Sequence, residues 1–140
     1  MIKKILVAAD DSIHARKAID YASDIALKYN ATVYVIHVVN TTFRLGDYEL
    51  MQKMEDALRQ GGKEIVEKAE SEIRVKGVKH FRSAVLVGDP ATEIIRYTKE
   101  NGVDMVVIGS RGEGTLEGLL FGSVSQKVCQ LASCTCVTVK

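Results

Sequence analysis

Short apolar runs alternate along the chain with longer stretches in which apolar residues recur every three or four positions. Three of the runs, residues 5–9, 33–39 and 105–109, are rich in β-branched residues and are bounded by charged or turn-forming residues, which is typical of buried strands. Residues 81–87 alternate more regularly and residues 136–139 form only a short run, and both patterns favour strands at the edges of a sheet. The hydrophobic pattern therefore predicts five strands.

Four helices are predicted between these strands. In each of them the apolar side chains recur at intervals of three and four residues, so they share one helical face. The recurring residues are Ala15, Ala18, Ala22, Ile25 and Tyr29 in the first helix, Leu50, Met54, Leu58, Ile65, Ala69 and Ile73 in the second, Ala91, Ile94 and Thr98 in the third, and Val124, Val128 and Leu131 in the fourth.

This alternation of strand and helix predicts an α/β fold, a Rossmann-like three-layer sandwich with a five-stranded parallel sheet and helices on both faces. No repeat or linker divides the sequence, so we expect one domain over residues 1–140. If the first, second and fourth strands are central, right-handed crossovers favour the order 3-2-1-4-5. The order reverses between the first and fourth strands, and the loops after Ala9 and Ile108 should therefore flank a ligand-binding crevice.

Charge and hydropathy exclude several classes of partner. The 19 basic and 18 acidic residues are spread along the chain and leave a net charge of +1, so no basic face is expected for nucleic acid. No apolar run approaches the length of a membrane span. The five apolar residues before Asp10 are too few for a signal peptide. We expect a cytoplasmic protein that contacts neither nucleic acid nor membrane.

The cysteines and histidines do not form a recognisable metal site. Cys129, Cys134 and Cys136 offer three soft ligands, whereas a structural zinc ion takes four. Cys129, on the fourth helix, is interpreted as core packing, and a bridge across a dimer through Cys134 or Cys136 is left open. The three histidines share no spacing. His37 lies in a buried strand and is interpreted as a packed neutral imidazole.

A glycine-rich segment follows the fourth strand, with five of the eleven glycines in residues 109–122. Backbone without Cβ atoms can lie close to a ligand and point its N–H groups at an anion. Residues 123–126, SVSQ, match a capping box and predict a helix that begins at Ser123, whose N-terminus would suit phosphate. From these residues alone, a surface loop followed by a simple helix cap is an equal alternative. The motifs GxxxxGK[ST] and GxGxxG are absent, which disfavours a P-loop ATPase and a dinucleotide site.

Capping also offers an ordinary role for the polar residues at two other helix starts. Asp11 and Ser12 precede the first helix, and we interpret both as caps, which leaves Asp10 as the better ligand candidate. Asp89 is expected to cap the third helix, with Pro90 in its first turn.

The glycine spacing also carries a family resemblance. Gly109, Gly112, Gly122 and Ser123 fit the pattern G-x2-G-x9-G-[S/T], and in this the chain resembles the ATP-binding subclass of the universal stress proteins. The likeness extends over nearly the whole chain. It includes KKILVAADDS (3–12), VYVIHVV (33–39), VLVGDPATEII (85–95) and DMVVIGSRG (104–112).

The resemblance implies a set of nucleotide contacts. Asp10 would meet the ribose or adenine, with Ala8 and Ala9 beside the base and the main chain of Val38 against adenine. The ribose and phosphates would contact Gly109, Arg111 and Gly112, and the phosphates would lie at Gly122, Ser123 and Val124. ATP with Mg²⁺ is the implied ligand.

The resemblance also implies a homodimer that pairs the last strands of two chains, together with a protein partner that stays unidentified. The sequence departs from the family at this edge. The family usually has a proline between the position of Cys134 and the last strand, whereas this chain has Thr135. A proline there would have fixed φ and removed a hydrogen-bond donor.

These features favour an ATP-binding regulatory protein of the stress response, in which the nucleotide biases dimer or partner contacts and is hydrolysed slowly at most. The alternatives are a nucleotide-independent dimeric interaction module of the same family and a weak ATPase. We predict no catalytic residue. An enzyme would need groups that activate water or another nucleophile, and Asp10 alone is a plausible base or magnesium contact. A phosphoacceptor receiver domain is disfavoured, because Asp89 lies too far along the chain from Asp10 and Asp11 and no helix follows Lys140.

Overall fold

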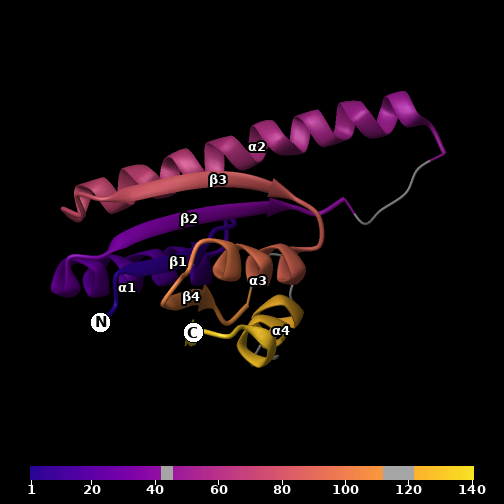
Figure 1. Cartoon of the computed structure of the whole chain (residues 1–140). Coiled ribbons are helices and arrows are strands. Elements are labelled where there is room, and N and C mark those ends of the chain that lie inside the picture. The colour runs from indigo at the N-terminus through magenta and orange to yellow at the C-terminus, as the bar shows by residue number, and fades with distance from the viewer. Residues whose placement is uncertain (42–45, 112–121) are drawn as a thin grey trace.

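The computed structural model describes residues 1–41, 46–111 and 122–140, in which five strands alternate with four helices (Figure 1). The elements are β1 (Lys4–Ala8), α1 (Ile13–Tyr29), β2 (Thr32–Val39), α2 (Tyr48–Val75), β3 (Phe81–Val87), α3 (Pro90–Glu100), β4 (Met105–Gly109), α4 (Ser123–Leu131) and β5 (Thr135–Val139). The five predicted strands and four predicted helices are confirmed, and strand boundaries differ from the predictions by one residue at most.

The strands form one parallel sheet in the order β3-β2-β1-β4-β5, as predicted. In the register, Ile5 of β1 stands beside Val33 of β2 and Met105 of β4. Every residue of β4 is buried, whereas β3 and β5 are only partly covered. The most apolar strands therefore occupy the centre of the sheet, and the two alternating or short ones form its edges.

Helices cover both faces of the sheet, which makes the predicted three layers. Helices α1 and α2 pack on one face, where Ile5 and Val7 contribute to the core. Helices α3 and α4 pack on the other, where the core includes Leu6 and Ile36. This alternation of Ile5, Leu6 and Val7 follows from the two-residue period of a strand, and it explains why the central strands are apolar without interruption.

The start of α1 is capped by Ser12, as predicted. Its Oγ accepts a hydrogen bond from the backbone N–H of Ala15 at 3.1 Å. Asp11, by contrast, is not a cap. Its exposed carboxylate lies 3.6 Å from Arg16 and 3.7 Å from Lys68. The prediction for Asp11 is therefore wrong, because Ser12 already occupies the N-cap position and the neighbouring cations attract the Asp11 carboxylate.

The start of α3 is capped by Asp89, with Pro90 as the first helical residue, and both predictions are confirmed. The Asp89 carboxylate accepts hydrogen bonds from the backbone N–H of Thr92 at 3.0 Å and from its hydroxyl at 2.7 Å. These two bonds stabilise the charged carboxylate and lower the pKa of Asp89.

Helix α4 begins at Ser123 as predicted, but the predicted capping box is not formed. The N-cap is Gly122, whose carbonyl accepts a hydrogen bond from Gln126 N at 3.1 Å. The capping box is displaced because the Gly122 N–H is bound to the carbonyl of Ser110 at 2.7 Å. This bond connects Gly122 to the end of β4 and makes Ser123 the first residue inside the helix. Cys129 is exposed, so its predicted core packing is also wrong.

Helix α2 is much longer than the sheet it covers. Its 28 residues span about 42 Å at 1.5 Å per residue, whereas the 8 residues of β2 span about 26 Å. The N-terminal half of α2 consequently extends beyond the end of β3 (Figure 1). Leu50, Met54 and Leu58, which continue the apolar pattern of Ala69 and Ile73, are 48%, 37% and 42% exposed.

The second half of α2 packs closely on the sheet. A Cβ atom on Gly62 would lie 2.8 Å from Cδ2 of His37 and 3.0 Å from Cγ1 of Val85. Only glycine therefore lets the helix approach β2 and β3 to this distance. Although α2 is long, neither it nor any other helix of the described ranges is apolar enough to cross a membrane.

Candidate functional site

A pocket of about 300 Å³ opens at the carboxyl ends of β1, β2 and β4. The ten residues proposed above as ligand contacts can be compared with its lining. Nine of them line the pocket: Ala8, Ala9, Asp10, Val38, Gly109, Arg111, Gly122, Ser123 and Val124. The tenth, Gly112, lies outside the described residues. Segments from opposite ends of the chain thus meet where the strand order reverses.

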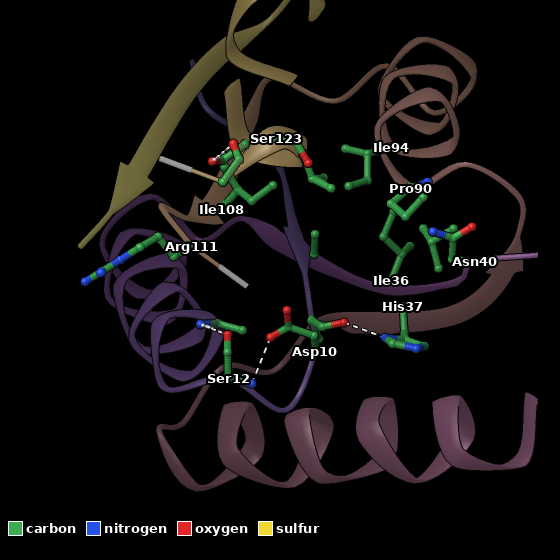
Figure 2. A pocket seen from close by; sticks show the side chains of 18 residues that line it. Asp10, Ser12, Ile36, His37, Asn40, Pro90, Ile94, Ile108, Arg111 and Ser123 are labelled. Carbon is green, nitrogen blue, oxygen red and sulfur yellow. Dashed lines mark hydrogen bonds between the residues drawn. The ribbon is translucent and has the colours of Figure 1, made fainter. Parts of the chain in front are cut away.

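One wall of the pocket is apolar. It is formed by Ile36 of β2 and by Pro90 and Ile94 of α3, and Ile108 of β4 lines the pocket beside Ser123 (Figure 2). Sequence analysis placed Ile36, Ile108 and Ile94 in the core and therefore missed their second role. An apolar wall facing a few polar groups is the usual composition of a small-molecule site, and here it would suit a flat, weakly polar ring.

The carboxylate of Asp10 lies at the opposite side of the pocket from Ile94 (Figure 2). Its Oδ1 accepts a hydrogen bond from the backbone N–H of Ser12 at 2.8 Å. This bond orients the carboxylate and, together with the Ser12 cap, fixes the turn between β1 and α1. Asp10 is therefore both a lining residue and part of the turn.

His37 connects β2 to the end of β1 beside the pocket. Its Nδ1 lies 2.7 Å from the carbonyl oxygen of Ala9, and the Ala9 N–H donates to the carbonyl of Ile36 at 2.8 Å. Because a carbonyl can only accept, Nδ1 of His37 carries a proton. The half-buried imidazole packs as predicted, but it also lines the pocket and holds the Ala9 peptide in place.

The first turn of α4 lies at the pocket without a side-chain cap from any of the described residues. Ser123 is exposed and Val124 is half-buried. The buried hydroxyl of Ser125 donates to the carbonyls of Ser110 at 2.8 Å and Gly122 at 3.0 Å, so it braces the turn rather than capping it. A helix N-terminus that carries partial positive charge and faces a pocket is suited to bind an anion.

Ser110 and Ser125 organise this turn, and sequence analysis missed both. The backbone N–H of Ser110 also donates to the carbonyl of Val139 in β5, at 2.7 Å. Ser110 therefore connects β4, β5 and the start of α4. The only signal in the sequence was Ser125 within SVSQ, and the capping-box interpretation assigned that pattern to Ser123 instead.

Gly109 has a structural reason to be glycine besides its place at the pocket. A Cβ atom there would lie 2.8 Å from the carbonyl carbon and Cβ of His14 and 3.0 Å from the backbone nitrogen of Ala15. Contacts that short to backbone atoms do not occur without displacement of α1. Gly109 thus lets β4 end directly against the start of α1.

Arg111 is half-buried and lines the pocket. Its guanidinium end points away from the space between Asp10 and Ile94 (Figure 2). In this arrangement the guanidinium is not directed into the pocket, and a contact with phosphate would require the side chain to turn.

The chain is similar over its whole length to proteins of one family. The model of the universal stress protein family matches residues 1–140. This chain belongs to the universal stress protein family. It is 35% identical to universal stress protein YxiE of Bacillus subtilis, over the full length of both chains. It is also 32% identical to universal stress protein MJ0531 of Methanocaldococcus jannaschii, over all of this chain and 83% of that protein.

Solved universal stress proteins have the same fold. The structure of UspA from Lactobacillus plantarum superposes with a TM-score of 0.92, covering 99% of this chain and 97% of that one at 21% sequence identity. At this identity the likeness concerns the fold, and it confirms the three-layer α/β architecture of this universal stress protein.

Proposed function

We propose that this universal stress protein is an ATP-binding regulatory protein of the stress response. The nucleotide binds between the loops after β1 and β4 and biases dimer or partner contacts. The observation that carries the proposal is the start of α4, where Gly122 and Ser123 line the pocket and no side chain of the described residues caps the helix. The same pocket is lined by a carboxylate, that of Asp10, and by an apolar wall. These three features match the phosphates, ribose and base of a nucleotide.

The proposed nucleotide lies with its base beside Ala8, Ala9 and the main chain of Val38. Asp10 contacts the ribose or adenine, and its carboxylate is also the group that would favour Mg²⁺ near the phosphates. Gly109, Arg111 and Gly112 line the ribose and phosphates, once the Arg111 side chain has turned toward the pocket. Gly122, Ser123 and Val124 hold the phosphates at the start of α4. In the described lining of the pocket, the remaining residues supply shape and hydrogen bonds rather than charge.

Three solved universal stress proteins of this fold support an adenine nucleotide as the ligand. One was solved with cAMP, one from Archaeoglobus fulgidus with dAMP, and one from Arabidopsis thaliana with AMP. Their TM-scores are 0.77, 0.71 and 0.70 at 22%, 24% and 21% identity, so they demonstrate what this fold can hold. Adenine is common to all three ligands, and the deciding comparison is therefore between adenine and guanine nucleotides.

The test is a series of thermal melts with ATP, ADP, AMP and GTP, with and without Mg²⁺, after the purified protein has been extracted to detect carried-over nucleotide. A ligand at a hundredfold excess over its Kd stabilises the folded state by about 2.7 kcal/mol. We expect ATP to raise the Tm of the parent. The Gly122→Val substitution places a branched side chain at the phosphates. It should abolish the rise in Tm caused by ATP while the fold survives.

Gly61→Val is the matched control for that variant. Among the described residues, a Cβ atom on Gly61 meets no atom within 4 Å beyond its chain neighbours and the backbone of its own helix, and Gly61 does not line the pocket. This variant should respond to ATP as the parent does. Equal ATP affinity in Gly122→Val and the parent would disprove the site. No shift in the parent, with no nucleotide in the extract, would favour the nucleotide-independent interaction module.

The charge of Asp10 can be separated from its structural role. Asp10→Asn keeps an Oδ1 that accepts from Ser12 N, so the turn should persist with a parental Tm in the absence of ligand. If Asp10 meets Mg²⁺ or the ribose as proposed, the ATP-induced shift becomes smaller, most of all with Mg²⁺ present. Phosphate release from the same samples should be slow, and rapid turnover would favour an enzyme instead.

The regulatory part of the proposal is a homodimer formed by pairing of the β5 edges, in the cytoplasm. In a strand, the N–H and C=O groups of one residue point to the same side. The carbonyl of Val139 accepts from the N–H of Ser110, which follows β4, so the backbone groups of Val139 face β4. Thr138 therefore directs its backbone groups outward. Thr138→Pro removes an outward donor and should yield monomers in sedimentation velocity, whereas Thr138→Val should stay dimeric. A dimer that persists in Thr138→Pro would place the interface elsewhere.

A further inference from the structure

Two thiols outside the pocket lie close together between α4 and β5. The Sγ atoms of Cys129 and Cys136 are 2.7 Å apart. Neither residue lines the nucleotide pocket. The side chains of Cys134 and Cys136 are both associated with the α3 and α4 face of the sheet, but it is Cys136 that contacts Cys129. Because disulfide sulfurs lie about 2.0 Å apart, this pair needs only a small approach to become bonded.

We infer that Cys129 and Cys136 form a reversible oxidation site, in which a peroxide converts the two thiols to an intramolecular disulfide while Cys134 stays reduced. This inference is independent of the proposed nucleotide site, since it involves neither the pocket nor its ligand. The sequence left open a disulfide between two chains through Cys134 or Cys136, whereas the disulfide inferred here lies within one chain.

The reaction has two steps. The Cys129 thiolate attacks one oxygen of the peroxide; the O–O bond breaks, Cys129 becomes a sulfenic acid, and hydroxide leaves when the oxidant is hydrogen peroxide. The Cys136 sulfur then attacks the Cys129 sulfur; the S–O bond breaks, the S–S bond forms, and the hydroxyl leaves as water with the proton from Cys136. Two thiols lose two electrons in all, and the peroxide gains them. A dithiol or a small thiol in excess restores the pair by exchange.

The surroundings of the two sulfurs assign these roles. Cys129 is exposed, so the oxidant reaches it first, and Cys136 is half-buried. Burial, with the hydrogen bond to Cys129, raises the pKa of Cys136 to about 12. Cys136 is therefore a neutral thiol near pH 7 and reacts poorly with peroxide, but it is in place to attack an oxidised Cys129. Burial also raises the pKa of Cys134.

A metal site explains the thiols less well. Within residues 1–41, 46–111 and 122–140, no three His, Cys, Asp or Glu side chains gather in a group that could hold a metal ion. Two sulfurs in contact, with one of them exposed, are instead the arrangement of an attacking and a resolving cysteine.

Analysis of a single peptide can determine which two cysteines form the disulfide. Cleavage after Lys127 releases residues 128–140, which contain all three cysteines. The full-length protein is treated with hydrogen peroxide, its free thiols are blocked with N-ethylmaleimide, and it is then reduced and labelled with iodoacetamide. We expect fragmentation spectra to show maleimide on Cys134 and carbamidomethyl groups on Cys129 and Cys136. Carbamidomethyl on Cys134, or a covalent dimer on a non-reducing gel, would overturn the inference.

Three serine variants test the order of events. Cys129→Ser should form no disulfide. Cys136→Ser should leave Cys129 as a sulfenic acid that dimedone traps, and Cys136→Ala repeats this test if the serine variant melts below the parent. Cys134→Ser is the matched control and should form the disulfide as the parent does. Dimedone on Cys134 or Cys136 in the parent, or loss of the disulfide in Cys134→Ser, would refute the assignment.

Discussion

Helices α1 and α4 start at the same edge of the sheet, after the neighbouring strands β1 and β4, yet their first turns are built differently. The turn before α1 is closed by side chains, because Ser12 caps the helix and Asp10 accepts from Ser12 N. The start of α4 has Gly122 as its N-cap and no side-chain cap from the described residues. The turn before α1 is therefore fixed by its own side chains, whereas the N-terminus of α4 is open to the pocket.

In the proposed binding site, the two junctions have different roles. Capping groups satisfy the N–H groups of a helix start and remove them from ligand binding. An uncapped start keeps those donors available, but it must be held in position from behind. Here the carbonyl of Ser110 accepts from Gly122 N and Ser125 Oγ, and these two bonds hold the start of α4 against the end of β4.

The largest expected effect comes from Gly109→Val, which disrupts the packing of the end of β4 against the start of α1. The new Cβ would lie 2.8 Å from backbone and side-chain atoms of His14, so α1 must shift. We expect a loss of about 3 kcal/mol in the free energy of unfolding, the upper part of the range for overpacking, measured as a lower urea midpoint. Gly61→Val, which adds a side chain in open space, should retain the parental midpoint, and an unchanged midpoint in Gly109→Val would contradict the packing argument.

Asp89 extends the comparison to a third helix start at the pocket, one that is capped by a charge. Asp89→Ala should cost about 1.5 kcal/mol at pH 7, as expected for a lost cap. Because the folded pKa of Asp89 lies below its ordinary value of 3.8, its carboxylate stabilises the fold above that pH and the contribution is lost as the pH falls through the folded pKa. Urea unfolding of both proteins at pH 7 and pH 3 should therefore show a smaller difference at pH 3. A constant difference would mean that the charge of Asp89 contributes nothing.

Ser12→Ala removes the cap that closes α1. It should lower the free energy of unfolding by about 1 kcal/mol, because the N–H of Ala15 loses the partner that lies at 3.1 Å. The hydroxyl does not ionise in this range, so the cost should be the same at pH 7 and pH 3, in contrast to Asp89→Ala. Stability equal to that of the parent in urea unfolding would show that water replaces this cap without cost.

Ser123→Ala should have the smallest effect. Ser123 is exposed and is not the N-cap of α4, so the change in the free energy of unfolding should stay within about 0.5 kcal/mol. Paired with Ser12→Ala in the same urea series, it measures the difference between a closed and an open helix start. A cost as large as that of Ser12→Ala would restore the capping box and remove the contrast.

Much of the fold could be predicted from local patterns. The strands were predicted from β-branched runs and the helices from apolar residues spaced three and four apart, because both patterns are visible within short windows. The order 3-2-1-4-5 followed from crossover handedness. The pocket edge followed from that order, and the candidate residues around it were those implied by the family resemblance that the glycine spacing carries. The contribution of His37 to the pocket was missed, because its bond to Ala9 joins two strands and leaves no local pattern.

The sequence by itself determined the type and order of the elements in this protein, since helical and strand periods are local properties of neighbouring residues. Only the tertiary structure decided that Leu50, Met54 and Leu58 remain exposed, because burial depends on how far the sheet reaches beneath α2. It also decided that Gly122 rather than Ser123 is the N-cap, and that Cys129 contacts Cys136 rather than the core. In each case the deciding distance joins separate elements, and no pattern along one segment records it.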